Sequence, residues 1–342
     1  MIDVDTLARI ECIAWRAPSA HNTQPWRLVP EDDAIRIEFE PQRWLAVADP
    51  NRRDLLLSLG AFTEAFLIAA AGERRPCCFE PDIDIARHRI GRFRAAPGYA
   101  TDYSADDLIA RRTSRLAFAP APLGAEAMAD LCDALSTGHG VAAVNNVDLL
   151  PLLMAADRAV FADADVVGEL RDWLRLSLRR DASPSDGLTA ACLGLKCWQA
   201  AMLRAVLSER VYPTARRIGL PMLLAFVGRT ALAHEGDTLV LTSERAGAAD
   251  LIAAGRGLLR LWLTLARRGL HAQPLSQLID FAGTREALGE LVRLPAGSRI
   301  LAVLRVGYSA RPALSPRRQG SHLTRPIDCP KNGIHAKFAD VE

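Results

Sequence analysis

Apolar side chains in the first third of the chain recur with the spacing of helices and strands. Residues 4 to 16 carry them on one helical face. Two short stretches, Trp26 to Val29 and Ile35 to Phe39, have the composition of strands and flank a polar turn. A long run from Leu55 to Ala69 then places leucines and phenylalanines on one broad helical face. We therefore predict a helix, a hairpin and a long apolar helix in this order.

A second long apolar helix is predicted over Ala246 to Arg268, and its glycines repeat those of the first. Gly60 and Gly72 in the first helix are separated by the same distance as Gly257 and Gly269 in the second, 197 residues later. The match could be chance, since helices bounded by glycines are common. If it reflects duplication, the chain is two related halves packed as two protomers would pack.

The remaining patterns extend this outline. Tyr103 to Ile109 predicts a helix whose N-cap is Ser104. Thr238 to Thr242 and Arg299 to Val306 have the pattern of buried strands, and we expect a loop over Leu270 to Gln277.

Composition and charge narrow the range of partners. The chain has 342 residues, a formal net charge of +2 and no run of about 18 apolar residues, so we expect a cytoplasmic protein without nucleic-acid or membrane partners. The seven cysteines and seven histidines form no spacing typical of a metal site, so no metal ligand is predicted.

One polar stretch, Ala17-Pro18-Ser19-Ala20-His21-Asn22-Thr23-Gln24-Pro25-Trp26, is neither helix interior nor central strand, because Pro25 lacks a backbone donor. It is either a polar turn before the first strand or a rigid loop that offers amides and hydroxyls to a flat ligand.

A second stretch, Arg111-Arg112-Thr113-Ser114-Arg115, gathers three guanidiniums and two hydroxyls, the groups that bind a phosphate. The alternative is the solvated basic end of the preceding helix. The doublet Arg317-Arg318 could reach the same anion.

Together these stretches resemble motifs of the flavin-dependent nitroreductase family. The loop resembles its Pro-Ser-x-x-Asn-x-Gln-Pro-Trp signature and the basic stretch its Arg-Arg-Ser-x-Arg phosphate motif, with Thr113 in place of the serine. Here the loop precedes the arginines, which resembles the Acg-type branch, a single-chain pseudo-dimer. The resemblance implies an α+β, nitroreductase-like fold of two related α/β halves with central mixed antiparallel sheets flanked by helices.

The resemblance also implies a division of the chain and one FMN held between the halves. We expect an N-terminal half over 1–100, a C-terminal half over 101–318 that includes a lid at 157–187, and an extended or partly disordered tail at 319–342. The chain would act as a monomer or form a homodimer.

The resemblance assigns the site residues as well. FMN would be bound by eight residues: Arg111, Arg112, Thr113, Arg115, Ser19, Asn22, Gln24 and Arg317. His21 and His271 are candidates for the substrate pocket, with a surface histidine as the alternative for His271. Hydride transfer needs no acid or base from the protein, so we predict no catalytic residue.

Three functions remain open at this point. The first is an FMN-dependent oxidoreductase that uses NAD(P)H to reduce a small nitro- or quinone-like compound by a ping-pong mechanism. The second is a protein that sequesters FMN with little turnover, and the third is a flavin-dependent dehydrogenase of a biosynthetic pathway.

Overall fold

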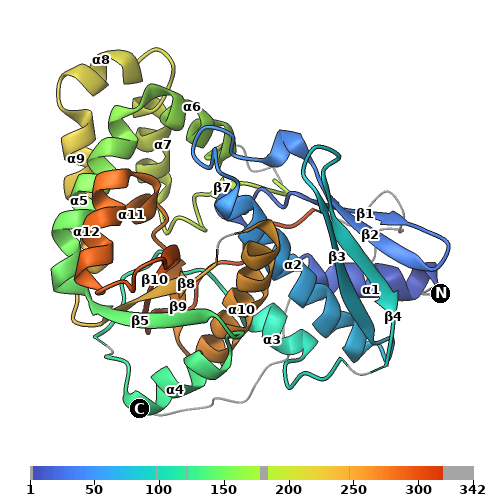
Figure 1. The fold of residues 1–342 in the computed structure, drawn as a ribbon. Coiled ribbons are helices and arrows are strands. Elements are labelled where there is room, and N and C mark those ends of the chain that lie inside the picture. The colour runs from blue at the N-terminus through green and yellow to red at the C-terminus, as the bar shows by residue number, and fades with distance from the viewer. Residues whose placement is uncertain (1–2, 98, 121, 178–183, 246, 319–342) are drawn as a thin grey trace, which may run out of the picture.

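Two four-stranded antiparallel sheets, one in each half of the chain, form the framework of the protein (Figure 1). The computed structural model describes residues 3–97, 99–120, 122–177, 184–245 and 247–318. The first sheet contains β1 (Trp26–Pro30), β2 (Ala34–Phe39), β3 (Cys77–Asp84) and β4 (Arg89–Ala95). The second contains β5 (His139–Asn145), β8 (Asp237–Ser243), β9 (His271–Pro274) and β10 (Arg299–Gly307).

The two sheets have the same connectivity. Their strand orders are β1-β2-β4-β3 and β5-β8-β10-β9, so the first, second, third and fourth strand of each half occupy equivalent positions. In each half a 20-residue helix joins the second strand to the third: α2 (Arg53–Gly72) and α10 (Ala248–Arg267). The architecture thus confirms the predicted pair of related halves.

The two long helices pack against each other through glycines related by this symmetry. A Cβ atom on Gly60 would overlap the Ile252 carbonyl oxygen, and one on Gly255 would overlap the Leu57 carbonyl oxygen. Each contact repeats the other, because Leu57 corresponds to Ile252 and Gly60 corresponds to Gly255. The glycine echo seen in the sequence, which matched Gly60 with Gly257, was therefore two positions out of register.

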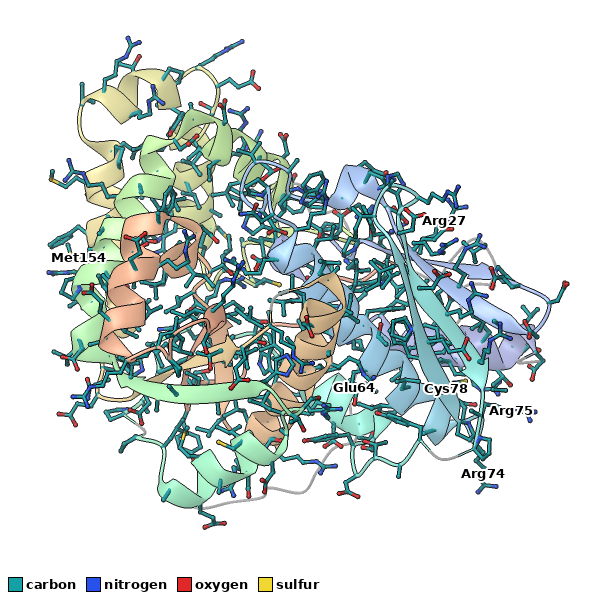
Figure 2. All side chains as sticks on the ribbon, in the orientation of Figure 1. Arg27, Glu64, Arg74, Arg75, Cys78 and Met154 are labelled. Carbon is teal, nitrogen blue, oxygen red and sulfur yellow. The ribbon has the colours of Figure 1, made fainter. Side chains whose placement is uncertain are left out.

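A buried carboxylate also joins these helices. Glu64 of α2 is 1% exposed and forms ion pairs with Arg256 (2.6 Å) and Arg260 (3.0 Å) of α10. The Tyr99 hydroxyl donates a hydrogen bond to the same carboxylate (2.8 Å). Figure 2 labels Glu64 where the two halves meet. Because a buried charge is costly when unpaired, this contact favours one alignment of the halves.

The halves differ most in the connection between their first two strands. A turn at 31–33 joins β1 to β2, whereas a helical lobe separates β5 from β8 (Figure 1). We call this set of five helices the helical lobe: α5 (Asn146–Ala162), α6 (Ala164–Trp173), α7 (Cys197–Val206), α8 (Tyr212–Arg217) and α9 (Leu220–Gly228). Two two-residue strands, β6 (Leu174–Arg175) and β7 (Leu188–Thr189), pair at its base.

Shorter helices complete the structure. They are α1 (Val4–Ala14), α3 (Ala105–Ala110), α4 (Ala125–Asp133), α11 (Gln277–Asp280) and α12 (Ala282–Leu291). Ser104 caps α3, as the sequence predicts, and the structure adds a capping box between Ser104 and Asp107. The predicted loop over 270–277 was wrong, because β9 occupies part of it and pairs with β10.

Residues 178–183 of the predicted lid and the whole predicted tail at 319–342 lie outside the residues that the structure describes. Among the described helices, α2 is long and apolar enough to cross a membrane, but 89% of its apolar window is buried inside the protein. That burial is typical of a core helix.

Candidate anion and flavin site

We call residues 17–26 the Pro-Ser loop. Its backbone is strained, and the Ser19 side chain helps to hold it in place. His21, Asn22 and Gln24 have φ angles of 45°, 58° and 51°, in the left-handed region that non-glycine residues rarely adopt. The Ser19 hydroxyl accepts a hydrogen bond from the Gln24 backbone N–H (2.9 Å) and closes the loop. Such strain persists only where the surroundings fix it, and it is concentrated at binding and active sites.

The loop amides bind segments that are far away in the sequence. Asn22 Nδ2 donates to the carbonyl oxygens of Gly187 (3.2 Å) and Pro316 (3.0 Å). Gln24 Nε2 donates to the Ser185 carbonyl (3.0 Å), and its Oε1 accepts from the Arg318 backbone N–H (2.9 Å). The loop is therefore enclosed by residues 184–187 on one side and by residues 316–318 on another.

The basic stretch reaches the same region from the second half. It follows α3 and runs beside β9, where Thr113 forms a parallel bridge with Ala272 and Ser114 N–H donates to the Ala272 carbonyl (3.1 Å). The Ser114 hydroxyl is 2.7 Å from that of Ser309, which in turn lies 3.0 Å from His271 Nδ1. His271 is thus part of a strand and a hydrogen-bonded chain, not of a surface loop.

Four arginines converge where the loop meets the basic stretch. Arg111 Nη2 donates to the Arg16 carbonyl (3.0 Å), and Arg317 Nη2 donates to the same oxygen (3.1 Å). Arg317 Nη1 also donates to Asn22 Oδ1 (2.7 Å). We call Arg16, Arg111, Arg112 and Arg317 the arginine cluster.

The arginine cluster lacks a compensating acid within the part of the chain that the structure describes. Arg111 is 4% and Arg112 8% exposed, yet no carboxylate of the described residues lies within ion-pair distance of any of the four guanidiniums. Buried nitrogens on three of them, Arg16 Nε, Arg111 Nε and Nη1, and Arg317 Nε, have no hydrogen-bond partner among these residues. The Arg111 guanidinium lies 4.8 Å from the centre of the Trp262 ring. Buried guanidiniums are ordinarily paired with acids, so the arginine cluster is a candidate site for an anion.

The pKa values of Arg16, Arg111 and Arg317 are lowered, because these guanidiniums are buried and lie close to one another. Burial, and then repulsion from Arg112, lowers the pKa of Arg16 to about 10. Burial, and then repulsion from Arg16 and Arg112, lowers the pKa of Arg111 to about 9. Burial also lowers the pKa of Arg317, and Arg16 and Arg111 contribute by repulsion. Arg16 and Arg111 therefore stay cationic at neutral pH while repelling each other.

His21 and Arg115 lie beside the cluster. Burial lowers the pKa of His21 to about 4, with a further contribution from Arg115, so this imidazole is neutral at pH 7. Its Nδ1 atom is buried and has no partner in the described part of the chain. Burial lowers the pKa of Arg115 as well, and its Nη1 donates to the Cys192 carbonyl (3.4 Å).

The residues predicted from the sequence thus gather at one junction between the halves. Arg111, Arg112 and Arg317 form one cluster with the loop residue Asn22 beside them, and Arg115 and His21 lie next to it. Their roles toward a ligand stay predictions. Sequence reasoning missed Arg16, whose signal was a lone charge directly before the Pro-Ser loop.

Sequence reasoning also missed three aspartates that lie close together near the start of α2: Asp49, Asp54 and Asp280. Burial, followed by repulsion from Asp54, raises the pKa of Asp49 to about 7. Arg53 bridges Asp54 and Asp280 of α11, both at 2.8 Å. These residues lie near the loop, since the Ser58 hydroxyl of the next helical turn accepts a hydrogen bond from the Ala20 N–H (3.3 Å).

Comparison with solved structures returns nitroreductases at low similarity. A nitroreductase with bound FMN from Bacteroides fragilis aligns over 66% of this chain and 99% of its own, with a TM-score of 0.37 and 15% identity. No family model matches the sequence.

Sequence relatives cover nearly the whole chain. Acg of Mycobacterium tuberculosis, named as a putative NAD(P)H nitroreductase, is 26% identical over 332 residues, which are 93% of this chain and 95% of Acg. PigM of a Serratia species, also named as an NAD(P)H nitroreductase, is 27% identical over 359 residues and 95% of each chain. Over nearly its whole length the chain is therefore similar to single-chain proteins named as NAD(P)H nitroreductases, in agreement with the resemblance of the loop and the basic stretch.

Proposed function

We propose that the protein is an FMN-binding, NAD(P)H-dependent oxidoreductase of nitroreductase type. The observation that carries this proposal is the arginine cluster, which presents buried guanidinium nitrogens without partners in the described chain beside the Pro-Ser loop. The names of Acg and PigM, relatives over nearly the full length, support the same assignment.

The residues present fit this cofactor at both ends. A phosphate dianion would compensate part of the cluster's charge, and its oxygens would accept hydrogen bonds from Arg16 Nε, Arg111 Nε and Arg317 Nε. Ser19, Asn22 and Gln24 would hold the ring system through the rigid loop. When bound, FMN would supply two-electron redox chemistry between NAD(P)H and a small nitro- or quinone-like acceptor.

The protein's own contribution is binding, orientation and exclusion of water. The loop amides would set the polarity near the ring, and Arg115 and Thr113 would line the phosphate end. His21 is neutral at pH 7, so its buried Nδ1 would contribute a hydrogen bond rather than a charge to the pocket. His271, held by Ser309, would lie at the pocket's edge.

The test is flavin content. The purified protein should be yellow, and the double variant Arg111→Ala/Arg115→Ala should lose the colour because the phosphate end is removed. Arg87→Ala is the matched control, since that side chain is 78% exposed in the β3–β4 turn and should leave FMN content unchanged. A wild-type protein that is colourless and takes up no FMN during titration would contradict the proposal.

One observation favours a second function, the sequestration of FMN with little turnover. Asn22 and Gln24 are hydrogen-bonded to Gly187 and Ser185, within the predicted lid. Stopped-flow mixing of the FMN-loaded protein with NADPH separates the two functions. Rapid bleaching of the flavin absorbance supports the enzyme, whereas a flavin that stays oxidised for minutes supports the store.

A further inference from the structure

The outer face of the helical lobe carries an apolar surface that no other part of the described chain covers. In α9, Met222, Leu223, Phe226 and Val227 are 62%, 59%, 50% and 56% exposed, and they follow one helical face. Ile218, just after α8, is 80% exposed. We call these five residues the lobe patch.

Helix α9 has no polar residue between Leu220 and Gly228. A helix that is apolar on every side is ordinarily buried on every side. The inner face of α9 packs on α5 and on the small cluster around Leu220 and Tyr212, whereas its outer face stays exposed. Elsewhere on the helical lobe, α7 exposes Trp198 and Met202, which are 62% and 55% exposed. Exposed apolar side chains that gather on one helical face, unlike singly scattered ones, are typical of a binding surface.

The charge of the same segment is one-sided. Between residues 196 and 229 the sequence holds six cations and one acid. The cations are Lys196, Arg204, Arg210, Arg216, Arg217 and Arg229, and the acid is Glu209. Glu209 pairs with Arg171 of α6, and no carboxylate of the described residues lies within ion-pair distance of the six cations. The Arg229 guanidinium lies 3.7 Å from the centre of the Phe226 ring, at the edge of the lobe patch.

We propose that the lobe patch binds the surface of an anionic lipid bilayer. Helices that lie in a membrane interface combine bulky apolar residues on one side with arginines and lysines at the rim. Anionic headgroups would compensate the cations, and the acyl boundary would take up Ile218, Leu223 and Phe226. The sequence-based expectation of no membrane partner rested on the net charge of +2 for the whole chain and on the lack of a spanning run. A peripheral contact needs no spanning run, and the excess of cations between residues 196 and 229 is local, so the proposal departs from that expectation.

Charge also argues against a second copy of the chain as the occupant. Such a contact would bring Arg216, Arg217 and Arg229 of both copies together, which is unfavourable. The lobe stands at one corner of the molecule, with α8 at its top and α9 along its outer edge (Figure 1). A contact through α8 and α9 would therefore leave the Pro-Ser loop, which lies beside α2, uncovered.

The experiment is flotation of the full-length protein with vesicles in which about one third of the phosphatidylcholine is replaced by phosphatidylglycerol, compared with pure phosphatidylcholine. Binding should require the anionic lipid and should fall at high salt. Arg217→Gln and Arg229→Gln should each weaken binding about fivefold. Leu223→Gln/Phe226→Gln should abolish it without lowering the melting temperature, because both side chains are at least half exposed.

Matched controls are Val4→Gln in α1, an apolar residue 58% exposed away from the lobe, and Arg87→Gln. Both should bind like the wild type. Three outcomes would overturn the proposal: no binding to anionic vesicles, binding that the lobe variants do not change, or a dimer in light scattering that Leu223→Gln/Phe226→Gln converts to monomer. The last result would show that a second copy covers the patch.

Discussion

The four guanidiniums of the arginine cluster lie together without a carboxylate of the described residues beside them. We therefore expect the stability of this region to depend on the anion that we propose to bind there. Each arginine loses water on folding, and its cationic neighbours repel it, so the cluster by itself is a destabilised part of the structure. A bound phosphate would attract all four guanidiniums and so offset the repulsion between them. Ligand affinity and stability without ligand should therefore respond in opposite directions when a guanidinium is removed.

Arg112→Met tests this opposition. Arg112 has no hydrogen bond to another described residue, and methionine keeps much of its apolar stem. Losing a charge-assisted hydrogen bond should weaken FMN binding about 10- to 100-fold. The melting temperature of the FMN-free protein should stay equal or rise. Flavin fluorescence titration and thermal unfolding measure the two effects, and a lower melting temperature with unchanged affinity would contradict the cluster's assignment.

Asp49 predicts a pH dependence of stability. Its pKa is raised in the folded protein to about 7, from an ordinary value of 3.8, chiefly by burial. The folded state then holds a proton that the unfolded state has released, so stability is lost as pH rises from about 4 to about 7. Asp49→Asn removes this loss and keeps an oxygen to accept the hydrogen bond that the Leu55 N–H now donates to the Asp49 carboxylate (2.9 Å).

The variant should therefore melt a few degrees above the wild type at pH 8 and at or below it at pH 4.5. Thermal unfolding in buffers of equal ionic strength is the measurement. An equal difference between variant and wild type at both pH values would show that the Asp49 carboxyl group does not titrate in this way.

At the scale of elements, the crossing of α2 and α10 depends on the absence of side chains at two positions. A methyl group on Gly60 would overlap the Ile252 carbonyl, and neither backbone can easily retreat because both helices are packed on further elements. Glu64, Arg256 and Arg260 fix the same crossing one turn further along α2.

Gly60→Ala should destabilise the protein by about 1–3 kcal/mol, the usual cost of inserting a methyl group into a packed core. Gly72→Ala is the matched control at the end of the same helix. Apart from its own stretch of helix, no described atom lies within 4 Å of the position that its methyl group would take, so Gly72→Ala should be neutral or stabilising by up to about 1 kcal/mol. Urea unfolding compares them, and similar values for both would contradict the close crossing.

Local patterns explain which elements could be predicted from the sequence. The capping of α3 at Ser104 and the apolar faces of α2 and α10 depend on near neighbours in the chain. By contrast, β9 spans His271–Pro274 and exists because it pairs with β10, which follows only after α11 and α12. The convergence of Arg16 with Arg317 also arises from contacts across the whole chain, and no local spacing signals it.

At the scale of the whole molecule, the two halves are alike in their sheets and unlike in their loops. Residues 15–25 separate α1 from β1 and include the Pro-Ser loop, whereas residues 134–138 alone separate the equivalent elements α4 and β5. The shorter turn, Ala134-Leu135-Ser136-Thr137-Gly138, contains no proline and no side-chain amide. The position related by symmetry therefore has no counterpart of the loop that we propose to hold the ring system.

One FMN per chain is therefore expected. Absorbance of the flavin released by denaturation, divided by protein concentration from amino-acid analysis, should approach one and should not exceed it at saturating FMN. A ratio near two would show that the second position binds flavin by other residues. The predicted boundary at residue 100 can be tested separately by limited proteolysis.

Because the two matching halves belong to one chain, mutations can change one half without changing the other. In an assembly of two identical subunits, each codon specifies a residue at two places, so no single mutation alters one place alone. Here Gly60 and Gly255 are encoded separately, and so are the long turn after α1 and the short turn after α4. One half can therefore accumulate an insertion as large as the helical lobe while the other keeps a short turn at 31–33, and selection can act on each independently.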